Sequence, residues 1–305
     1  MLMGLGPCVA VSSSNWLIAW VGIELSFLGL MPLLVSGEGK GVPTLSSESA
    51  LKYFCVQAAG SGLLMCGGVM KFMMPSLMGD FITNIIFLSG LMLKLGIFPF
   101  HFWVPSVVAG LGWYSMFLVL TWQKIAPFMF MMNLLASVPS FSSIVLMLGG
   151  VSAIVGAMIG LNQTKIAPVL GASSITHSGW VAAGAACGGF WVYFSIYCFS
   201  LVFLLFFLSK NQEFMSGVVM LSLSGLPPFV MFLGKWSVLK CALSLSEYWW
   251  FISLPLFGSV MSLFFYLKFF YSFYLESENS STVKLSFLTC FSMLGLFGTL
   301  FMISF

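Results

Sequence analysis

The sequence predicts an all-α protein, a polytopic membrane helix bundle of about ten or eleven transmembrane helices. Composition is the first reason, because 60% of the residues are hydrophobic, only 6% are charged and the mean hydropathy is +1.08. A soluble domain carries roughly 25% charged residues, so this chain cannot cover itself with a water-facing surface. The second reason is the apolar runs, which are long enough to cross a hydrocarbon core ~30 Å thick. The two-residue alternation of a membrane β-strand is absent from them.

The predicted spans follow one another with short connections, so we expect a single membrane-embedded domain over residues 1–305. Residues 1–14 form a shortened first span that ends in the polar Ser12–Ser14. A Gly/Ser/Glu loop through Glu48 follows the second span, and the polar Lys210–Glu213 separates two later ones. Trp and Tyr near predicted span ends, such as Trp16 and Trp113, are typical of membrane interfaces. After the first, the spans are 15–35, 50–74, 80–102, 108–133, 140–160, 168–187, 190–209, 216–243, 249–274 and 284–304.

Charge and cysteine usage exclude several classes of function. The formal net charge is +3 without any basic run, so we expect no nucleic-acid partner. The seven cysteines show no CxxC spacing, and most lie in apolar spans, where a free Cys behaves as a small hydrophobe. Phosphate-binding loops, dinucleotide fingerprints and haem or iron–sulfur motifs are absent. We therefore expect no cofactor and no metal in this chain, so any driving force must come from elsewhere.

Four ionisable residues fall well inside predicted spans: Glu24, Lys94, Lys124 and Lys235. Most other charges lie in loops or near a span end, where lysine reaches water. A charge at the centre of a membrane helix costs ~2.5–3.5 kcal/mol on insertion scales. Four of them cost on the order of 10 kcal/mol, which is comparable with the net stability of a domain. The cost indicates a functional site. The alternative is that some reach the interface, or that Glu24 pairs with a lysine as a structural tie.

Prolines lie close in sequence to three of these charges. They are Pro99, Pro127, Pro227 and Pro228. A proline inside a helix leaves the carbonyl four residues earlier without its donor. That rule predicts freed carbonyls at Leu95, Gln123, Leu223 and Ser224. Gly96 and Gly225 add flexibility beside two of these points. Broken helices beside buried lysines predict an ion site at mid-membrane, and the alternative is that the prolines only kink their helices.

The residue types at these positions suit proton transfer. Burial disfavours the charged form of lysine and a neighbouring carboxylate favours it, so one nearby charge can switch a buried lysine between holding and releasing a proton. Moving one charge through a membrane potential costs ~2.3 kcal/mol per 100 mV. A change of about two units in the pKa of a lysine is worth ~2.7 kcal/mol, which is a sufficient scale to drive that movement. His101 and His177 are further candidates as proton relays, because free histidine titrates near neutrality. The alternative for each histidine is a satisfied hydrogen-bonding role.

Six stretches, taken in order along the chain, resemble a known family. They are NWLIAWVGIELSFLGLMPLLV (15–35), KYFCVQAAGSGLLM (52–65), LKLGIFPFHFWVPSV (93–107), LTWQKIAPF (120–128), GLNQTKIAPVLGASSITHSGW (160–180) and LSLSGLPPFVMFLGKW (221–236). Together they resemble the family of NADH dehydrogenase (ubiquinone) subunit 2, antiporter-like membrane subunits of mitochondrial respiratory complex I. The match after Lys235 is one of pattern only.

The resemblance implies a site and a setting. Glu24 and Lys94 correspond to the family's glutamate–lysine pair, Lys124 to its central lysine and Lys235 to the lysine of the second broken helix. The implied fold is two inverted repeats, each with a broken helix, and the implied place is the mitochondrial inner membrane. Partners would be other complex I membrane subunits and phospholipid, including cardiolipin. NADH, FMN, iron–sulfur clusters and ubiquinone would belong to partner subunits. Two alternatives stay open, a free-standing cation/proton antiporter and a scaffold that conducts nothing.

Overall fold

The computed structural model describes residues 1–36, 43–73, 79–245 and 249–276, with the single positions 286, 289, 292, 293, 295 and 298. Within these residues all regular structure is helical, so the predicted all-α membrane bundle is confirmed. Six helical segments of the described part are long and apolar enough to cross a membrane. Most of the predicted span 284–304 lies outside the described residues.

The chain forms two compact units, Met1–Phe141 and Ser142–Phe305. They are called unit 1 and unit 2 below, and each is described by itself. The expectation of one membrane-embedded domain over the whole chain stays a prediction.

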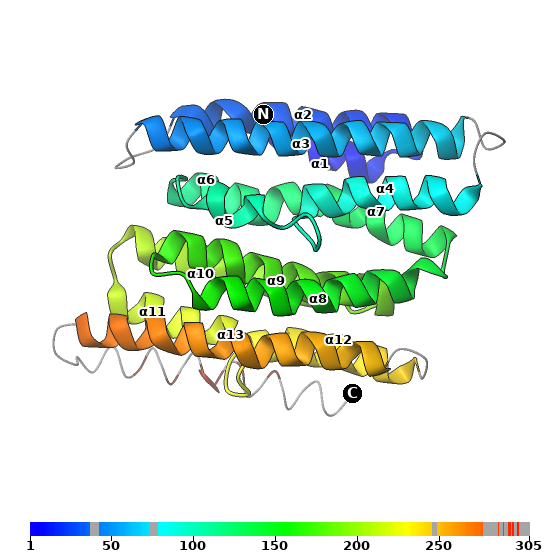
Figure 1. Cartoon of the computed structure of the whole chain (residues 1–305). Helices are drawn as coiled ribbons and strands as arrows, with labels where there is room; N and C mark the ends of the chain where they lie inside the picture. Colours follow the sequence, from blue (N-terminus) through cyan, green and yellow to red (C-terminus); the bar gives the residue numbers. More distant parts are fainter. Residues whose placement is uncertain are drawn as a thin grey trace. The chain divides into compact units, whose positions relative to one another are not determined.

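The described residues of unit 1 form seven α-helices and one π-helical turn. In order these are α1 (Leu2–Ser12), α2 (Trp16–Ser36), α3 (Pro43–Phe72), α4 (Asp80–Leu95), α5 (Trp103–Val108), α6 (Trp113–Phe117), a π-helix (Leu118–Trp122) and α7 (Gln123–Ser137). Figure 1 shows α1 lying along α2, and α3 running beside α4. Small residues bring α1 and α2 together, since a Cβ on Gly22 would lie 2.7 Å from the backbone nitrogen of Ala10. Such close approach is what drives helix association in lipid.

The predicted span 80–102 is broken. Helix α4 ends at Leu95, Gly96 adopts a left-handed conformation (φ 70°), and a new helix, α5, begins only at Trp103. Pro99 therefore lies in the connection and not inside a helix. Gly96 ends the helix because a residue without a Cβ adopts positive φ readily. The carbonyls of the last turn of α4 therefore lack helical donors because the helix stops there, and not because a proline interrupts it.

The predicted span 108–133 contains a feature that the sequence reasoning missed. Helices α6 and α7 are joined by the π-helical turn Leu118–Trp122, which ends directly before Gln123 and Lys124. Pro127 lies inside α7, as predicted. Single π-turns within α-helices are frequent at functional sites, and this one immediately precedes a buried lysine.

Unit 2 is built around α9. Its helices are α8 (Phe141–Leu161, the first residue belonging to unit 1), α9 (Ile166–Cys187), α10 (Phe190–Ser209), α11 (Glu213–Leu223), α12 (Met231–Ser244) and α13 (Trp249–Glu276). Every residue of α9 from Pro168 to Gly184 is buried, and α9 contacts α10, α12 and α13. A helix that is buried on all sides forms the centre of its bundle.

The second break lies between α11 and α12. Helix α11 ends at Leu223, Gly225 adopts a left-handed conformation (φ 74°), and α12 begins at Met231. Pro227 and Pro228 occupy the connection between the two helices. The predicted span 216–243 is therefore a second broken helix, as the sequence led us to expect.

Candidate functional site

A buried ion pair joins α2 to the last turn of α4 in unit 1. The Lys94 Nζ lies 2.8 Å from the Glu24 Oε1, with the Lys94 side chain 1% exposed and the Glu24 side chain 19% exposed. Gly60 of α3 leaves space for the lysine stem, because a Cβ there would lie 2.8 Å from the Lys94 Cγ. The structure thus brings together Glu24 and Lys94, the two residues that the family resemblance predicts to form a pair. The Glu24 carboxylate remains partly exposed.

Side chains satisfy the carbonyls that the first break exposes. The Gln57 Nε2 donates to the Lys94 carbonyl at 3.3 Å, and the Trp103 Nε1 donates to the Leu93 carbonyl at 3.1 Å. Irregular backbone at membrane depth is tolerated only where such partners or cavity water replace the lost helix bonds. Gln57 and Trp103 therefore fix the backbone that carries Lys94.

Lys124 is the second residue of α7 and is only 4% exposed. The preceding residue, Gln123, ties this point to α2. Its Nε2 donates to the Ser26 carbonyl at 3.0 Å, and its Oε1 lies 3.1 Å from the Ser26 hydroxyl. Ser26 is two residues beyond Glu24, which is a rise of about 3 Å along the helix. The start of α7 is therefore held close to the level of the ion pair.

Lys235, the fifth residue of α12, closes the second break in unit 2. Its Nζ donates to the Ser224 carbonyl at 2.5 Å, and it lies 5.8 Å from the centre of the Trp180 ring. The residue is 7% exposed. The sequence predicted that the Ser224 carbonyl would lack its helical donor. In the structure the Lys235 ammonium is the donor to this carbonyl. Gly225 makes the contact possible, since a Cβ there would lie 2.8 Å from the Lys235 Nζ.

His177 lies in the middle of α9, between two tyrosine hydroxyls. Its Nδ1 is 2.9 Å from the Tyr193 hydroxyl of α10, and its Nε2 is 3.2 Å from the Tyr266 hydroxyl of α13. The Trp180 ring, which faces Lys235, stacks on Tyr193 with ring centres 6.1 Å apart. Both ring nitrogens therefore face groups that can donate or accept a proton.

The Tyr197 ring lies 4.8 Å from the His177 ring, and its hydroxyl is buried without a hydrogen-bond partner among the described residues. Buried polar atoms that lack a protein partner are the usual binding points of ordered water. His177 is therefore surrounded by aromatic rings whose hydroxyl groups lie around its imidazole.

His101 occupies the first break and does not join the ion pair. It is 2% exposed, its ring lies 4.1 Å from that of Phe102, and its Nδ1 has no hydrogen-bond partner within the described parts of the chain. In the residues that the structure describes, no group of three or more His, Cys, Asp or Glu side chains is placed to hold a metal ion.

Sequence reasoning assigned no role to the side chains of several residues of these sites: Ser26, Gln57, Gln123, Tyr193, Tyr197 and Tyr266. The amides did carry a signal, because Gln57 and Gln123 are uncharged polar residues inside apolar stretches. The tyrosines carried none, because they are scattered among the many aromatic residues of α10 and α13.

An all-helical membrane bundle with two broken helices, each carrying a buried lysine at the break, defines a class of antiporter-like membrane proteins. Residues 13–216 match the family described as NADH:quinone oxidoreductase/Mrp antiporter, TM, and the chain belongs to this family. The resemblance to NADH dehydrogenase subunit 2 is confirmed by the curated relatives named NADH-ubiquinone oxidoreductase chain 2. The relative from Albinaria caerulea is 37% identical over 90% of this chain and 88% of its own length. The one from Anopheles gambiae is 34% identical over 92% of this chain and 87% of its own length.

A solved structure shares the fold. A chain of respiratory complex I from Thermus thermophilus is similar with a TM-score of 0.80 and 24% identity, over 97% of this chain and 76% of that one. The two chains therefore have similar folds.

Proposed function

We propose that this chain is a proton-transferring core membrane subunit of NADH:ubiquinone oxidoreductase, complex I, and that it lies in the mitochondrial inner membrane. The names of its relatives, its family and its fold support this. The observation that carries the proposal is the Glu24–Lys94 ion pair beside a helix break, because a buried switchable pair is costly unless it is used.

In unit 1 the ion pair acts as the switch. While Glu24 lies beside Lys94, the ammonium is stabilised by its counter-charge. A change of charge near the accessible edge of Glu24 draws the carboxylate away, and the buried ammonium then favours release of its proton. Lys124 is the acceptor, since it is buried and anchored next to this level through Gln123.

In unit 2 the proton is carried by Lys235, His177 and the tyrosine hydroxyls around the histidine. Lys235 holds its proton against the Ser224 carbonyl, and displacement from that carbonyl is the event that would release it. The hydroxyls of Tyr193 and Tyr266 allow His177 to pass a proton through either ring nitrogen. His101 is a candidate relay at the first break.

The chemistry that drives transfer belongs to other subunits. NADH, FMN, iron–sulfur clusters and ubiquinone would be bound by partners of this chain, and quinone reduction there would change the charge near Glu24. The neighbouring partners are other membrane subunits of complex I, together with phospholipid that includes cardiolipin.

Substitution of Lys124 in the assembled complex tests the proposal. Lys124→Met should abolish proton pumping coupled to NADH oxidation, because methionine fills the site but cannot carry a proton. The control is Lys165→Met, which changes an exposed lysine at the start of α9. Equal proton-to-electron ratios in the two variants would contradict the proposal and favour a non-conducting scaffold.

A free-standing cation/proton antiporter is the second candidate, because the matching family includes Mrp antiporters. The chain purified alone and placed in liposomes separates the two. Cation-driven proton exchange without partners would favour the antiporter. Co-migration of the chain with a large NADH-oxidising assembly on a native gel, and no exchange by the isolated chain, favours the subunit.

A further inference from the structure

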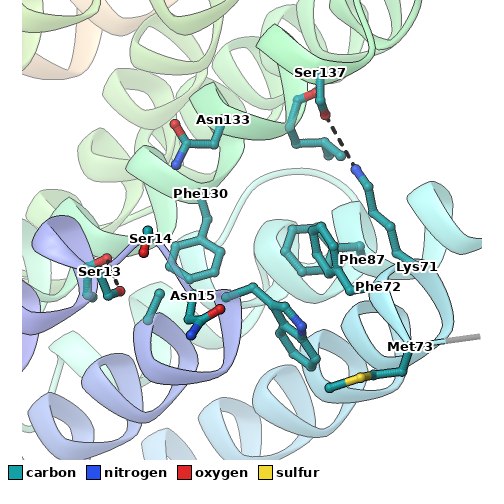
Figure 2. A pocket seen from close by; sticks show the side chains of 14 residues that line it. Ser13, Ser14, Asn15, Lys71, Phe72, Met73, Phe87, Phe130, Asn133 and Ser137 are labelled. Atoms are coloured by element: carbon teal, nitrogen blue, oxygen red, sulfur yellow. Dashed lines mark hydrogen bonds between the residues drawn. The ribbon is translucent and has the colours of Figure 1, made fainter.

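A cavity of about 560 Å³ opens in unit 1 where four apolar helices begin or end, three of which belong to segments long enough to span a membrane. The ends of α1, α3 and α7 and the start of α2 surround it. Figure 2 shows the side chains that line it. Because membrane helices end at the interface between lipid and water, we place the mouth of this cavity, called the Lys71 cavity below, at the headgroup level of one leaflet. It lies apart from Glu24 and Lys94, neither of which lines it.

The inner part of the Lys71 cavity is apolar and aromatic. Trp16 stacks on Phe72 with ring centres 5.5 Å apart, and Phe87 and Phe130 stack at 6.2 Å. Phe72 is 50% exposed and Met73 is 58% exposed, although both are large apolar side chains. A wall of this kind suits hydrocarbon and glycerol-ester groups far better than water.

The rim of the cavity is polar and carries one cation. Ser13, Asn15, Asn133 and Ser137 supply neutral hydroxyl and amide groups. Lys71 is the single charged residue among the described residues that line the cavity. Figure 2 shows its side chain reaching from α3 toward Ser137 at the end of α7.

The Lys71 ammonium is weakly engaged by the protein itself. Its Nζ lies 3.4 Å from the Ser137 hydroxyl and 5.5 Å from the centre of the Phe72 ring. It makes no ion pair within 4.0 Å with a carboxylate of the described residues. By contrast, Lys52 on the same helix lies 2.5 Å from Glu48. An ammonium held by one neutral hydroxyl has free donors, and phosphate oxygens are among its best acceptors.

We propose that the Lys71 cavity is a binding site for the headgroup and glycerol region of one zwitterionic glycerophospholipid, of the phosphatidylethanolamine type. The phosphodiester accepts hydrogen bonds from Lys71 and from the rim, and the upper acyl chains lie against Trp16 and Phe72. The volume falls within the roughly 300–1,000 Å³ that is typical of ligand pockets. Basic pockets between membrane helices are known to hold lipid headgroups.

The charge at the rim selects the kind of phospholipid. Asp80, at the first turn of α4, is close enough to interact electrostatically with Lys71. Asp80 does not itself line the cavity, so it lies outside, where it can attract the ammonium of a headgroup whose phosphate contacts Lys71. Cardiolipin has two phosphates, and the second would meet no other cation among the described lining residues.

The test is photolabelling of the assembled complex with phosphatidylethanolamine that carries a diazirine in the upper part of one acyl chain. Labelled peptides are mapped by mass spectrometry. The proposal expects labels on peptides that contain Trp16 or Phe72 and Met73, and loss of these labels with excess unlabelled phosphatidylethanolamine. Lys71→Gln should lower the labelling about tenfold or more, which is the loss of one charge-assisted hydrogen bond. The matched control, Lys52→Gln at the other end of α3, should leave it unchanged.

Competition in the unsubstituted complex keeps the test decisive if Lys71→Gln does not assemble. Inorganic phosphate that removes the label would show a site for the free anion and would overturn the lipid assignment. Stronger competition by cardiolipin than by phosphatidylethanolamine would overturn the choice of headgroup. Equal labelling in Lys71→Gln and Lys52→Gln, or the absence of lipid label from the peptides that contain Trp16 or Met73, would remove the proposal altogether. None of these results depends on whether the chain transfers protons.

Discussion

Gly225→Ala probes the link between the second helix break and Lys235. Gly225 has φ 74°, and a Cβ on it would lie 2.8 Å from the Cδ, Cε and Nζ of Lys235. Alanine should therefore push the lysine side chain away from the Ser224 carbonyl, which it reaches at 2.5 Å in the unsubstituted chain. The lysine itself is untouched, so any effect reports its position.

Two terms set the size of the effect. A side chain in the left-handed region costs roughly 1–2 kcal/mol of backbone strain. Loss of a buried hydrogen bond to a charged group costs about 1.5–3 kcal/mol more. The second term alone corresponds to about a tenfold or larger shift away from the conformation in which Lys235 reaches the carbonyl.

Gly188→Ala is the matched control, because it carries the strain without the clash. Gly188 ends α9 with φ 108°, and a Cβ there would meet no atom within 4 Å. Both variants belong in assembled complex in proteoliposomes, where proton uptake is measured per NADH oxidised. Gly188→Ala should pump at a near-normal ratio, whereas Gly225→Ala should lose about tenfold or more of its coupled pumping.

The reasoning would be wrong if both glycine variants pumped with the same ratio. It would also be wrong if Gly225→Ala lowered the amount of assembled complex while the complex that remained kept the normal ratio, since the glycine would then serve folding alone. Quantifying the chain on a native gel separates lost assembly from lost coupling.

Three further substitutions test other contacts. Gln123→Ala removes both contacts with Ser26 and should lower the proton-to-electron ratio while the complex still assembles; a normal ratio would exclude Gln123 as a positioning residue. Trp103→Phe leaves the Leu93 carbonyl without its donor and should cost about 1–3 kcal/mol of local stability, seen as faster amide exchange at the end of α4; unchanged exchange would show that another donor replaces the indole. Tyr266→Phe removes one hydroxyl from His177 and should slow pumping without changing assembly; a variant that pumps at the normal rate would show that proton transfer does not need this hydroxyl.

The sequence predicted the helical bundle and the positions of the buried lysines because a charge stands out against an apolar background. Lys94, Lys124 and Lys235 are all buried in the structure, whereas Glu24 retains some exposure. The breaks were also predictable, since glycine and proline limit where a helix continues. The exact residue at which each helix ends was not predictable, because Gly96 ends α4 three residues before Pro99.

Contacts between distant segments could not be read from the sequence. Ser26 and Gln123 are 97 residues apart, and nothing in either stretch names the other as a partner. The π-turn Leu118–Trp122 likewise contains no glycine or proline that would have marked it in the sequence. Tyr193 and Tyr266 meet at His177 only because α10 and α13 both pack against α9.

The most direct test of proton transfer through the ion pair is the number of protons moved per NADH oxidised by complex that carries Lys94→Met. Lys52→Met, on an exposed lysine, serves as the reference. The account predicts that the reference variant keeps the normal number, and that Lys94→Met loses coupled proton movement even when assembled complex is present in normal amount. An unchanged number in assembled Lys94→Met complex would contradict it.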